Sequence, residues 1–164
     1  MSLTPADTAF LAHAPLMARF TPQELQIFAS YLNPQEYQAG QVMIWEKTPH
    51  RSLSLLMSGV AVVSKTIRGD VESVLARLTS GDHFGELSLL DEEPASCSVT
   101  AEEDCRVLII EYSELERLFD EESALFAKLT WAMLKDLAHK LRATNRKVQE
   151  AVEWGLDAAS LDHW

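Results

Sequence analysis

The chain has 164 residues, of which 47% are apolar, and its 25 acidic residues outweigh its 14 lysines and arginines to give a net charge of −11. This length predicts one domain with at most a short tail, and the apolar content supplies a sizeable core, which argues against global disorder. A strongly acidic chain is a poor candidate for nucleic-acid binding by itself, because proteins that contact phosphates carry a basic face. A local basic patch could still form around residues 135–147.

Neither a membrane span nor an export signal is visible. No apolar run reaches about 18 residues, so we expect no membrane segment. The N-terminus lacks a basic stretch followed by an apolar one, so no secretory signal is expected. We therefore expect a cytoplasmic protein, in which Cys97 and Cys105 are buried thiols rather than a disulfide.

The N-terminal segment, residues 1–35, reads as helical from residue 4 to residue 32. Thr4-Pro5-Ala6-Asp7 and Thr21-Pro22-Gln23-Glu24 each place a threonine before a proline and a carboxylate two residues later. This pattern predicts a capping box at a helix start, because the threonine and the carboxylate each accept an N–H of the first turn. Asn33-Pro34 is expected to end the second helix.

Residues 36–120 are predicted to form short strands, the last of them at residues 106–110. Short strands separated by regular turns are typical of a β-sandwich or barrel. Arg68-Gly69-Asp70 lies between two apolar residues and predicts a hairpin turn. The other predicted turns are Ala39-Gly40, Thr48-Pro49-His50, Ser58-Gly59 and Ser80-Gly81-Asp82.

The stretch from Gly81 to Ala101 carries the candidate site. After the turn at residues 80–82, Gly85 and Glu86 open an apolar segment, Leu87-Ser88-Leu89-Leu90, that reads as one turn of helix. Free amides at the start of a helix favour an anion, and glycine lets the backbone approach a ligand. Glu86 could accept from sugar hydroxyls, and the serines at positions 96 and 98 could donate to a phosphate.

This stretch resembles the phosphate-binding cassette of the cyclic-nucleotide-binding domain family, which includes catabolite activator protein and the regulatory subunits of cAMP-dependent kinase. Its pattern is roughly F-G-E-x-[AS]-L-L, then P-R-[AS]-A-[ST]-V. The segment from Phe84 to Leu90 fits every position of the first half, and Pro94-Ala95-Ser96-Cys97-Ser98-Val99 matches the second half except at two positions. Cys97 replaces a small alanine, whereas Ala95 replaces the arginine that pairs with the cyclic phosphate. The resemblance covers roughly residues 36–110.

Further landmarks of the family recur in the expected order, and Lys47 stands where the family often has glycine, which is expected to alter only a turn. The landmarks are Tyr37-x-x-Gly40, Ile44-x-Glu46, the run from Leu55 to Val62, and Leu75-x-x-Leu78-x-x-Gly81-Asp82.

The resemblance implies a cyclic-nucleotide ligand, cAMP or cGMP, whose binding is weakened or altered because the cassette arginine is missing. Losing one partner of a buried charge pair costs about 2–5 kcal/mol, or roughly 30-fold to a few thousand-fold in affinity. Arg51, Arg77 or another base could compensate, and Arg77 could instead pair with Glu86. The ligand-binding residues that the resemblance implies are Gly85, Glu86, Leu87, Ser88, Ala95, Ser96, Cys97 and Ser98.

The C-terminal part is predicted to be helical, with a capping box at Ser113-Glu114-Leu115-Glu116 and then one long helix over residues 121–154. In that helix, apolar and small residues recur at steps of three and four, which is typical of a coiled-coil seam. We expect this seam to make a homodimer through residues 125–152, and the resemblance implies the same, since the family's helix often pairs in dimers and caps the nucleotide. The alternative is that the helix only covers the chain's own core. The seam residues are Leu134, Leu137, Leu141, Thr144, Val148 and Ala151, with Leu125, Leu129 and Met133 as an adjacent stripe.

Gly155 is expected to stop the helix, which leaves residues 155–164 as a tail. This tail is either disordered or folded back so that Trp164 is buried. In some relatives that cannot bind nucleotide, a terminal segment occupies the pocket, so a folded-back tail could do the same here.

These observations predict a mainly β fold: a double-stranded β-helix, or jelly-roll-like β-roll, with N-terminal helices and a long C-terminal helix. The expected function is a regulatory sensor module that acts on an unidentified protein partner. The alternative is a degenerate, nucleotide-free module for dimerisation or protein interaction. We do not expect a cupin-like enzyme or a metal site, because no histidine pair with ligand spacing occurs. No helix-turn-helix segment follows the long helix, so DNA binding is not expected.

Overall fold

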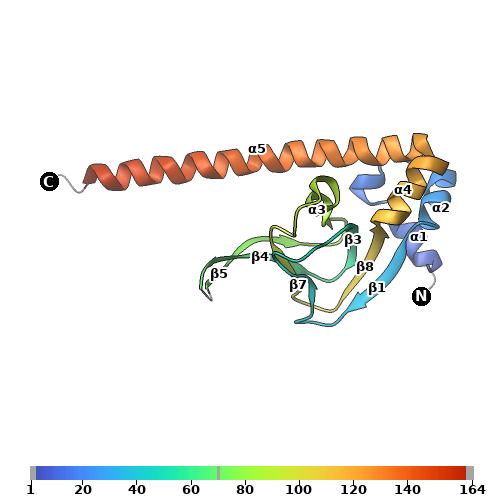
Figure 1. The fold of residues 1–164 in the computed structure, drawn as a ribbon, viewed down its shortest axis with the longest axis horizontal. Coiled ribbons are helices and arrows are strands. Elements are labelled where there is room, and N and C mark those ends of the chain that lie inside the picture. Colours follow the sequence, from blue (N-terminus) through green and yellow to red (C-terminus); the bar gives the residue numbers. More distant parts are fainter. Residues whose placement is uncertain (1–2, 70, 162–164) are drawn as a thin grey trace. The chain divides into compact units, whose positions relative to one another are not determined.

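The computed structural model describes residues 3–69 and 71–161, with side chains as far as residue 154. The chain divides into two compact units, Met1–Leu129 and Thr130–Trp164. The first unit holds all the strands and most of the helices, and the second consists of the greater part of one long helix. Figure 1 shows the order of the elements along the chain.

The two predicted helix starts are confirmed. The N-terminal helices are α1 (Pro5–Leu11), η1 (Pro15–Met17) and α2 (Pro22–Ala29). At the start of α1, the Thr4 amide donates to the Asp7 carboxylate at 2.6 Å, and the Asp7 amide donates to the Thr4 hydroxyl at 3.3 Å. Thr21 and Glu24 repeat the arrangement at the start of α2, at 2.7 and 3.3 Å. Both capping boxes therefore satisfy amides that have no partner within the helix.

In the described part of the chain, eight strands form two antiparallel four-stranded sheets, in the orders β1-β8-β3-β6 and β2-β7-β4-β5. The first strand begins at Asn33, three residues before the expected start of the β region, and includes Pro34. Proline is tolerated there because β1 is an edge strand, where a missing N–H costs no ladder bond. The strands are β1 (Asn33–Tyr37), β2 (Val42–Ile44), β3 (Ser52–Ser58), β4 (Ala61–Arg68), β5 (Val71–Leu78), β6 (His83–Phe84), β7 (Ser98–Ala101) and β8 (Cys105–Glu111).

The hairpin predicted at residues 68–70 is confirmed by the pairing of β4 with β5, which closes at Arg68 opposite Val71. Asp70 lies outside the described residues. Lys47 adopts a left-handed backbone, with φ of 64°, which explains why glycine suits this position in related sequences.

Apolar side chains from both sheets meet in one core, so the predicted mainly β fold with flanking helices is confirmed. This core also contains Ala95, which lies between α3 (Glu86–Asp91) and β7 and is 5% exposed. Cys97 and Cys105 are free thiols, as expected, although only Cys105 is fully buried. The buried core residues are Ile44, Leu56, Ala61, Phe84, Ala95, Val99, Ala101, Cys105, Val107 and Ile109.

The predicted capping box at Ser113 is wrong. Strand β8 runs directly into α4 (Tyr112–Glu121), so Glu111 is the residue before the helix and makes no side-chain cap. Ser113 therefore lies inside the first turn, and Glu114 forms an ion pair with Arg117 at 2.8 Å. A break at Glu122 separates α4 from the long helix α5 (Ser123–Leu161).

The helix stop predicted at Gly155 is also wrong, because α5 continues to Leu161. A glycine inside a helix costs only about 1 kcal/mol, and the residues that follow it include good helix formers. The two alternatives for Trp164 lie outside the described residues. Among the helices in the described part of the chain, none combines the length and apolar character needed to cross a lipid bilayer.

Candidate functional site

The candidate site begins where β6 ends and α3 starts. Gly85 caps α3 with a left-handed backbone, at φ of 87°. A Cβ atom on residue 85 would lie 2.5 Å from the Ser52 carbonyl oxygen and 2.8 Å from Nε2 of His50. Both contacts are too short for carbon, so the first half of the predicted cassette can pack against the start of β3 only with glycine at this position.

The predicted turn of helix is confirmed as α3, and two of its polar residues are buried. Glu86 and Ser88 are buried, at 6% and 5% exposure, whereas Leu87 is exposed. A carboxylate oxygen of Glu86 lies within 4.8 Å of a ring nitrogen of His83, which is also buried. Burying a carboxylate is costly unless polar groups surround it, so this environment fixes Glu86 in the interior of the fold.

Arg51 is held at the end of α3. Glu92, which ends the helix with a left-handed backbone at φ of 61°, accepts a hydrogen bond from the Arg51 guanidinium at 3.0 Å. The same guanidinium lies 3.8 Å from the centre of the Tyr112 ring. The sequence suggested Arg51 as a base that could serve in place of the arginine that the resemblance implies at residue 95. In the structure Arg51 contacts a carboxylate and an aromatic ring.

Ala95, where the resemblance implies an arginine, has its methyl group in the hydrophobic core. Its amide donates to the Thr48 carbonyl at 2.9 Å, and its own carbonyl accepts the Lys47 amide at 2.7 Å. Residue 95 is therefore fixed on both sides by the loop after β2, and its side chain offers no hydrogen-bonding group.

Ser96 and Ser98, which follow Ala95, make polar contacts with residues distant in the sequence. The Ser96 carbonyl accepts a hydrogen bond from Nζ of Lys65, on β4, at 3.1 Å. The Ser98 hydroxyl accepts the amide of Glu46 at 3.0 Å, and it keeps a proton to donate. The Glu46 carboxylate in turn accepts the Thr66 amide at 2.9 Å, which lowers the pKa of that carboxyl below its ordinary value.

The hydrogen bonds of Arg77 go to Glu102 and not to the cassette. It donates to both carboxylate oxygens of Glu102, at 3.0 and 3.2 Å, on the exposed surface of the roll. The suggested pairing of Arg77 with Glu86 is thus replaced by this pair. Lys65 and His50 were not predicted as site residues, because their contacts join segments separated by 31 and 35 residues along the chain and no local pattern marks them.

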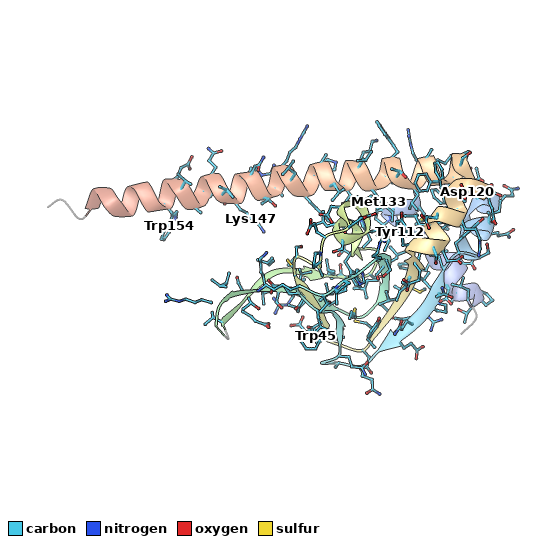
Figure 2. All side chains as sticks on the ribbon, viewed as in Figure 1. Trp45, Tyr112, Asp120, Met133, Lys147 and Trp154 are labelled. Atoms are coloured by element: carbon cyan, nitrogen blue, oxygen red, sulfur yellow. The ribbon has the colours of Figure 1, made fainter. Side chains whose placement is uncertain are left out.

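An open groove of about 340 Å³ lies elsewhere, along the edge strands β1 and β2. Its lining includes Tyr37 and Trp45, and Figure 2 shows Trp45 on the outside of the fold. Trp45 is 62% exposed. None of the predicted ligand-binding residues lines this groove, so it is distinct from the cassette.

Comparison with known proteins identifies the domain. The family model described as "Cyclic nucleotide-binding domain" matches residues 34–122, a little over half of the chain. The chain is 36% identical over 110 residues to a cAMP-dependent protein kinase regulatory subunit from Aspergillus fumigatus. That match covers 67% of this chain but only 26% of the Aspergillus protein, so the chain spans about a quarter of that relative's length.

Solved structures agree with this match. A cyclic nucleotide-binding domain from Methylobacillus flagellatus superposes with a TM-score of 0.78 at 21% identity, over 87% of this chain and 80% of that one. The catabolite activator protein of Thermus thermophilus superposes with a TM-score of 0.75 at 28% identity, over 82% and 62% of the two chains.

A third solved structure shares the fold. It is a triple mutant of the regulatory subunit of a cAMP-independent protein kinase A from Trypanosoma brucei, described as bound to cAMP, and one of its substitutions introduces an arginine. It superposes with a TM-score of 0.66 at 19% identity, over 78% of this chain and 44% of that one. At this identity the likeness concerns the fold alone. The family match, the two packed sheets and the cassette at Gly85 together show that the chain belongs to the cyclic nucleotide-binding domain family.

Proposed function

We propose that this chain is a regulatory sensor module that binds a cyclic nucleotide, cAMP or cGMP, with weakened or altered affinity. The ligand would lie against residues 85–88 and 95–98, with Glu86 accepting from the sugar hydroxyls and the serines donating to the phosphate. Similarity to a protein named as a cAMP-dependent kinase regulatory subunit supports this role and suggests a protein partner downstream. The role is one of binding, and the proposal assigns no catalysed reaction to the site.

The observation that carries the proposal is the position of Ala95. Its methyl group lies in the core, so no guanidinium is available there for a phosphate. Both arginines suggested as substitutes bind carboxylates, Arg51 that of Glu92 and Arg77 that of Glu102. Without a charged partner at residue 95, affinity is expected to fall by roughly 30-fold to a few thousand-fold relative to an intact cassette.

Calorimetric titration with cAMP and cGMP, up to millimolar concentration, tests the proposal on the wild type and on Ala95→Arg. We expect weak binding by the wild type and clearly tighter binding by the variant. Because the new arginine enters at a buried position, circular dichroism and thermal unfolding must first show that the variant is folded. Micromolar binding by the wild type with no gain in a folded variant would contradict the proposed effect of residue 95.

A second function, a nucleotide-free module for dimerisation, is favoured by one observation in the second unit. Apolar residues of the proposed seam are exposed in the single chain, with Leu134, Leu141 and Val148 between 52% and 62% exposed. We propose that residues 125–152 pair with a second copy of this chain.

A thermal-shift measurement separates the two functions. A ligand that binds only the folded state raises the melting temperature, by an amount that grows with its concentration. A sensor should therefore melt at a higher temperature in millimolar cAMP or cGMP than in the same concentration of adenosine, which carries no phosphate. No shift with either cyclic nucleotide would favour the nucleotide-free module.

A further inference from the structure

Lys65 brings a positive charge to the second half of the cassette. It lies on β4, which pairs with β7 so that Ser64 is opposite Ser98. Its side chain reaches back to the residue that follows Ala95, where Nζ lies 3.1 Å from the Ser96 carbonyl oxygen. This ammonium is therefore held directly beside the position at which related domains place their arginine.

The contact leaves the charge of Lys65 available. An ammonium has three donors, and the Ser96 carbonyl takes one of them. Because this carbonyl is neutral, the hydrogen bond positions the lysine without compensating its charge. Arg51 and Arg77 differ in this respect, since they form ion pairs with Glu92 and Glu102.

The Glu46 carboxylate lies near Lys65. Its pKa is lowered mainly by the hydrogen bond from the Thr66 amide, and the positive charges of Lys47 and Lys65 also lower it. That amide fixes one oxygen of Glu46 at 2.9 Å. An anionic ligand beside Ser96 would thus meet the ammonium of Lys65, with the Glu46 carboxylate nearby and held by the backbone.

We propose that Lys65 supplies the positive charge that binds the ligand's phosphate in place of the arginine that Ala95 replaces. This inference rests on the proposed function, because it assigns the phosphate contact of that same site. A lysine acts as a point charge on a flexible stem, whereas an arginine offers a planar pair of donors that fits a phosphate. The replacement therefore predicts a site that recognises negative charge with less demand on the exact phosphate geometry.

The test is calorimetric titration of cAMP into the full chain carrying Lys65→Gln or Lys65→Arg. Hydrogen bonds to charged groups are among the stronger polar contacts, so Lys65→Gln is expected to weaken binding about tenfold or more. Lys65→Arg keeps the charge and should stay within about threefold of the wild type. Equal binding by the wild type and Lys65→Gln would overturn the inference while leaving the proposed function in place.

Two control variants test whether the position of the charge matters. Lys47→Gly removes the other lysine near Glu46 at a position whose φ of 64° suits glycine, and Arg68→Gln removes a charge from the same strand as Lys65. Both should bind within about threefold of the wild type, because only Lys65 is held by a hydrogen bond at the Ser96 carbonyl and exposed charges that are not held at the ligand are largely screened. A loss in Lys47→Gly or Arg68→Gln equal to that in Lys65→Gln would overturn the inference.

The double variant Ala95→Arg with Lys65→Gln completes the design. If the two cations do the same task, the arginine should restore the affinity that Lys65→Gln loses. Failure of the wild type to bind any cyclic nucleotide would end both the proposed function and this inference, whereas a wild type that binds independently of Lys65 would end only the inference. The unfolding midpoint of each variant shows that a loss of affinity is not a loss of fold.

Discussion

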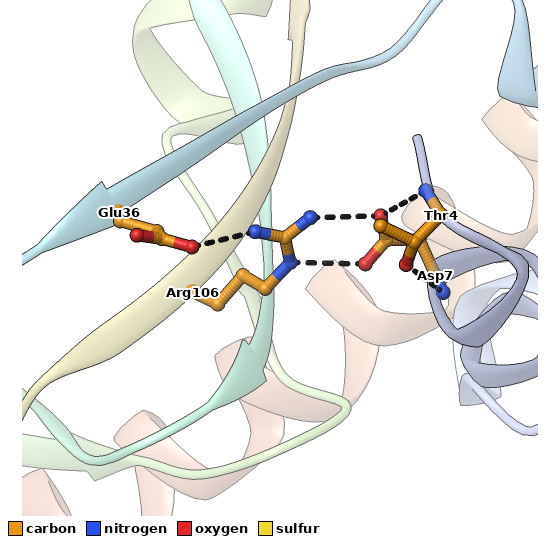
Figure 3. Close-up of polar contacts among 4 residues, drawn as sticks. All are labelled: Thr4, Asp7, Glu36 and Arg106. Atoms are coloured by element: carbon orange, nitrogen blue, oxygen red, sulfur yellow. Dashed lines mark hydrogen bonds and ion pairs between the residues drawn. The ribbon is translucent and has the colours of Figure 1, made fainter. Parts of the chain in front are cut away.

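At the scale of single residues, one ion pair ties the N-terminus to the β-roll. Figure 3 shows the Arg106 guanidinium between Asp7 of α1 and Glu36 of β1. Arg106 donates to both oxygens of Asp7, at 2.8 and 3.0 Å, and the Asp7 side chain is almost fully buried. Its contact with Glu36 is equally short, at 2.8 Å, but that carboxylate is 63% exposed. The two carboxylates on one guanidinium therefore differ mainly in burial.

We expect Asp7→Asn to lower the free energy of unfolding by about 3 kcal/mol, because it removes the almost fully buried carboxylate that pairs with Arg106. Glu36→Gln should cost less than about 1 kcal/mol, since exposed ion pairs contribute little. Urea denaturation of the three proteins at neutral pH measures both values. Equal losses in the two variants would show that burial does not set the strength of these pairs.

The same pair predicts a dependence of stability on pH. Hydrogen bonds from Arg106 lower the pKa of Asp7 from 3.8 to about 2. Because the folded-state pKa is the lower one, the stabilisation is complete above the unfolded value and disappears as the pH falls from 3.8 through about 2. The difference in unfolding free energy between wild type and Asp7→Asn should therefore shrink across this range. A difference that stayed constant down to pH 2 would contradict the assignment.

Two glycines with a left-handed backbone, Gly85 and Gly40, allow the cost of backbone strain to be separated from the cost of steric crowding. Gly85 and Gly40 have nearly the same φ, at 87° and 85°, but a Cβ at Gly40 would meet no atom within 4 Å. Gly40→Ala should thus cost only the strain of a left-handed backbone, on the order of 1 kcal/mol. Gly85→Ala adds two collisions, with Ser52 and His50, and should cost at least about 1 kcal/mol more. Comparing the two unfolding curves measures the difference, and a Gly85→Ala loss no larger than that of Gly40→Ala would contradict it.

For single residues, the sequence predicts where the cassette lies better than it predicts which side chains form ion pairs. The cassette from Phe84 to Ser98 can be recognised because its small and acidic residues follow a local pattern. The partners of Arg51 and Arg77 could not be predicted, because Glu92 and Glu102 lie 41 and 25 residues away along the chain and only the folded structure brings them close. Lys65 was missed for the same physical reason.

At the scale of elements, local capping patterns succeed only where a helix starts from a loop. Thr21 caps α2 through the Glu24 amide, whereas Ser113 lies inside α4, whose start is fixed by the strand before it. We expect Thr21→Ala to cost about 1 kcal/mol of unfolding free energy and Ser113→Ala to cost less than about 0.5 kcal/mol. Denaturation at neutral pH distinguishes them. A larger loss of unfolding free energy in Ser113→Ala than in Thr21→Ala would indicate that Ser113 caps a helix after all.

The long helix α5 shows the opposite error. Gly155 looked like a helix stop, yet the helix passes through it, because one glycine costs less than ending a helix without a cap. The start of α5 was therefore predicted to within about two residues, whereas its end was predicted before Gly155 and lies at Leu161. The apolar spacing within it was the more dependable signal, since periodicity is averaged over many residues.

At the scale of the whole molecule, the second unit cannot bury its own apolar residues. From residue 144 to residue 154 every described side chain of α5 is exposed, and Figure 2 shows Lys147 and Trp154 projecting from these turns. Trp154 is 82% exposed. A helix with an uncovered apolar seam gains stability by pairing, which is the basis for the proposed homodimer.

Leu141→Glu tests that dimer, because it places a charge in the middle of the seam, between Leu134 and Val148. We expect this variant to be monomeric at concentrations where the wild type is dimeric, since an unpaired carboxylate in an apolar interface is costly. Arg146→Glu changes the charge on the opposite side of the same helix and should leave the dimer intact. Sedimentation equilibrium at micromolar concentrations gives the mass of each protein. A monomeric wild type, or a dimer that survives Leu141→Glu, would mean that the seam does not join two copies of this chain.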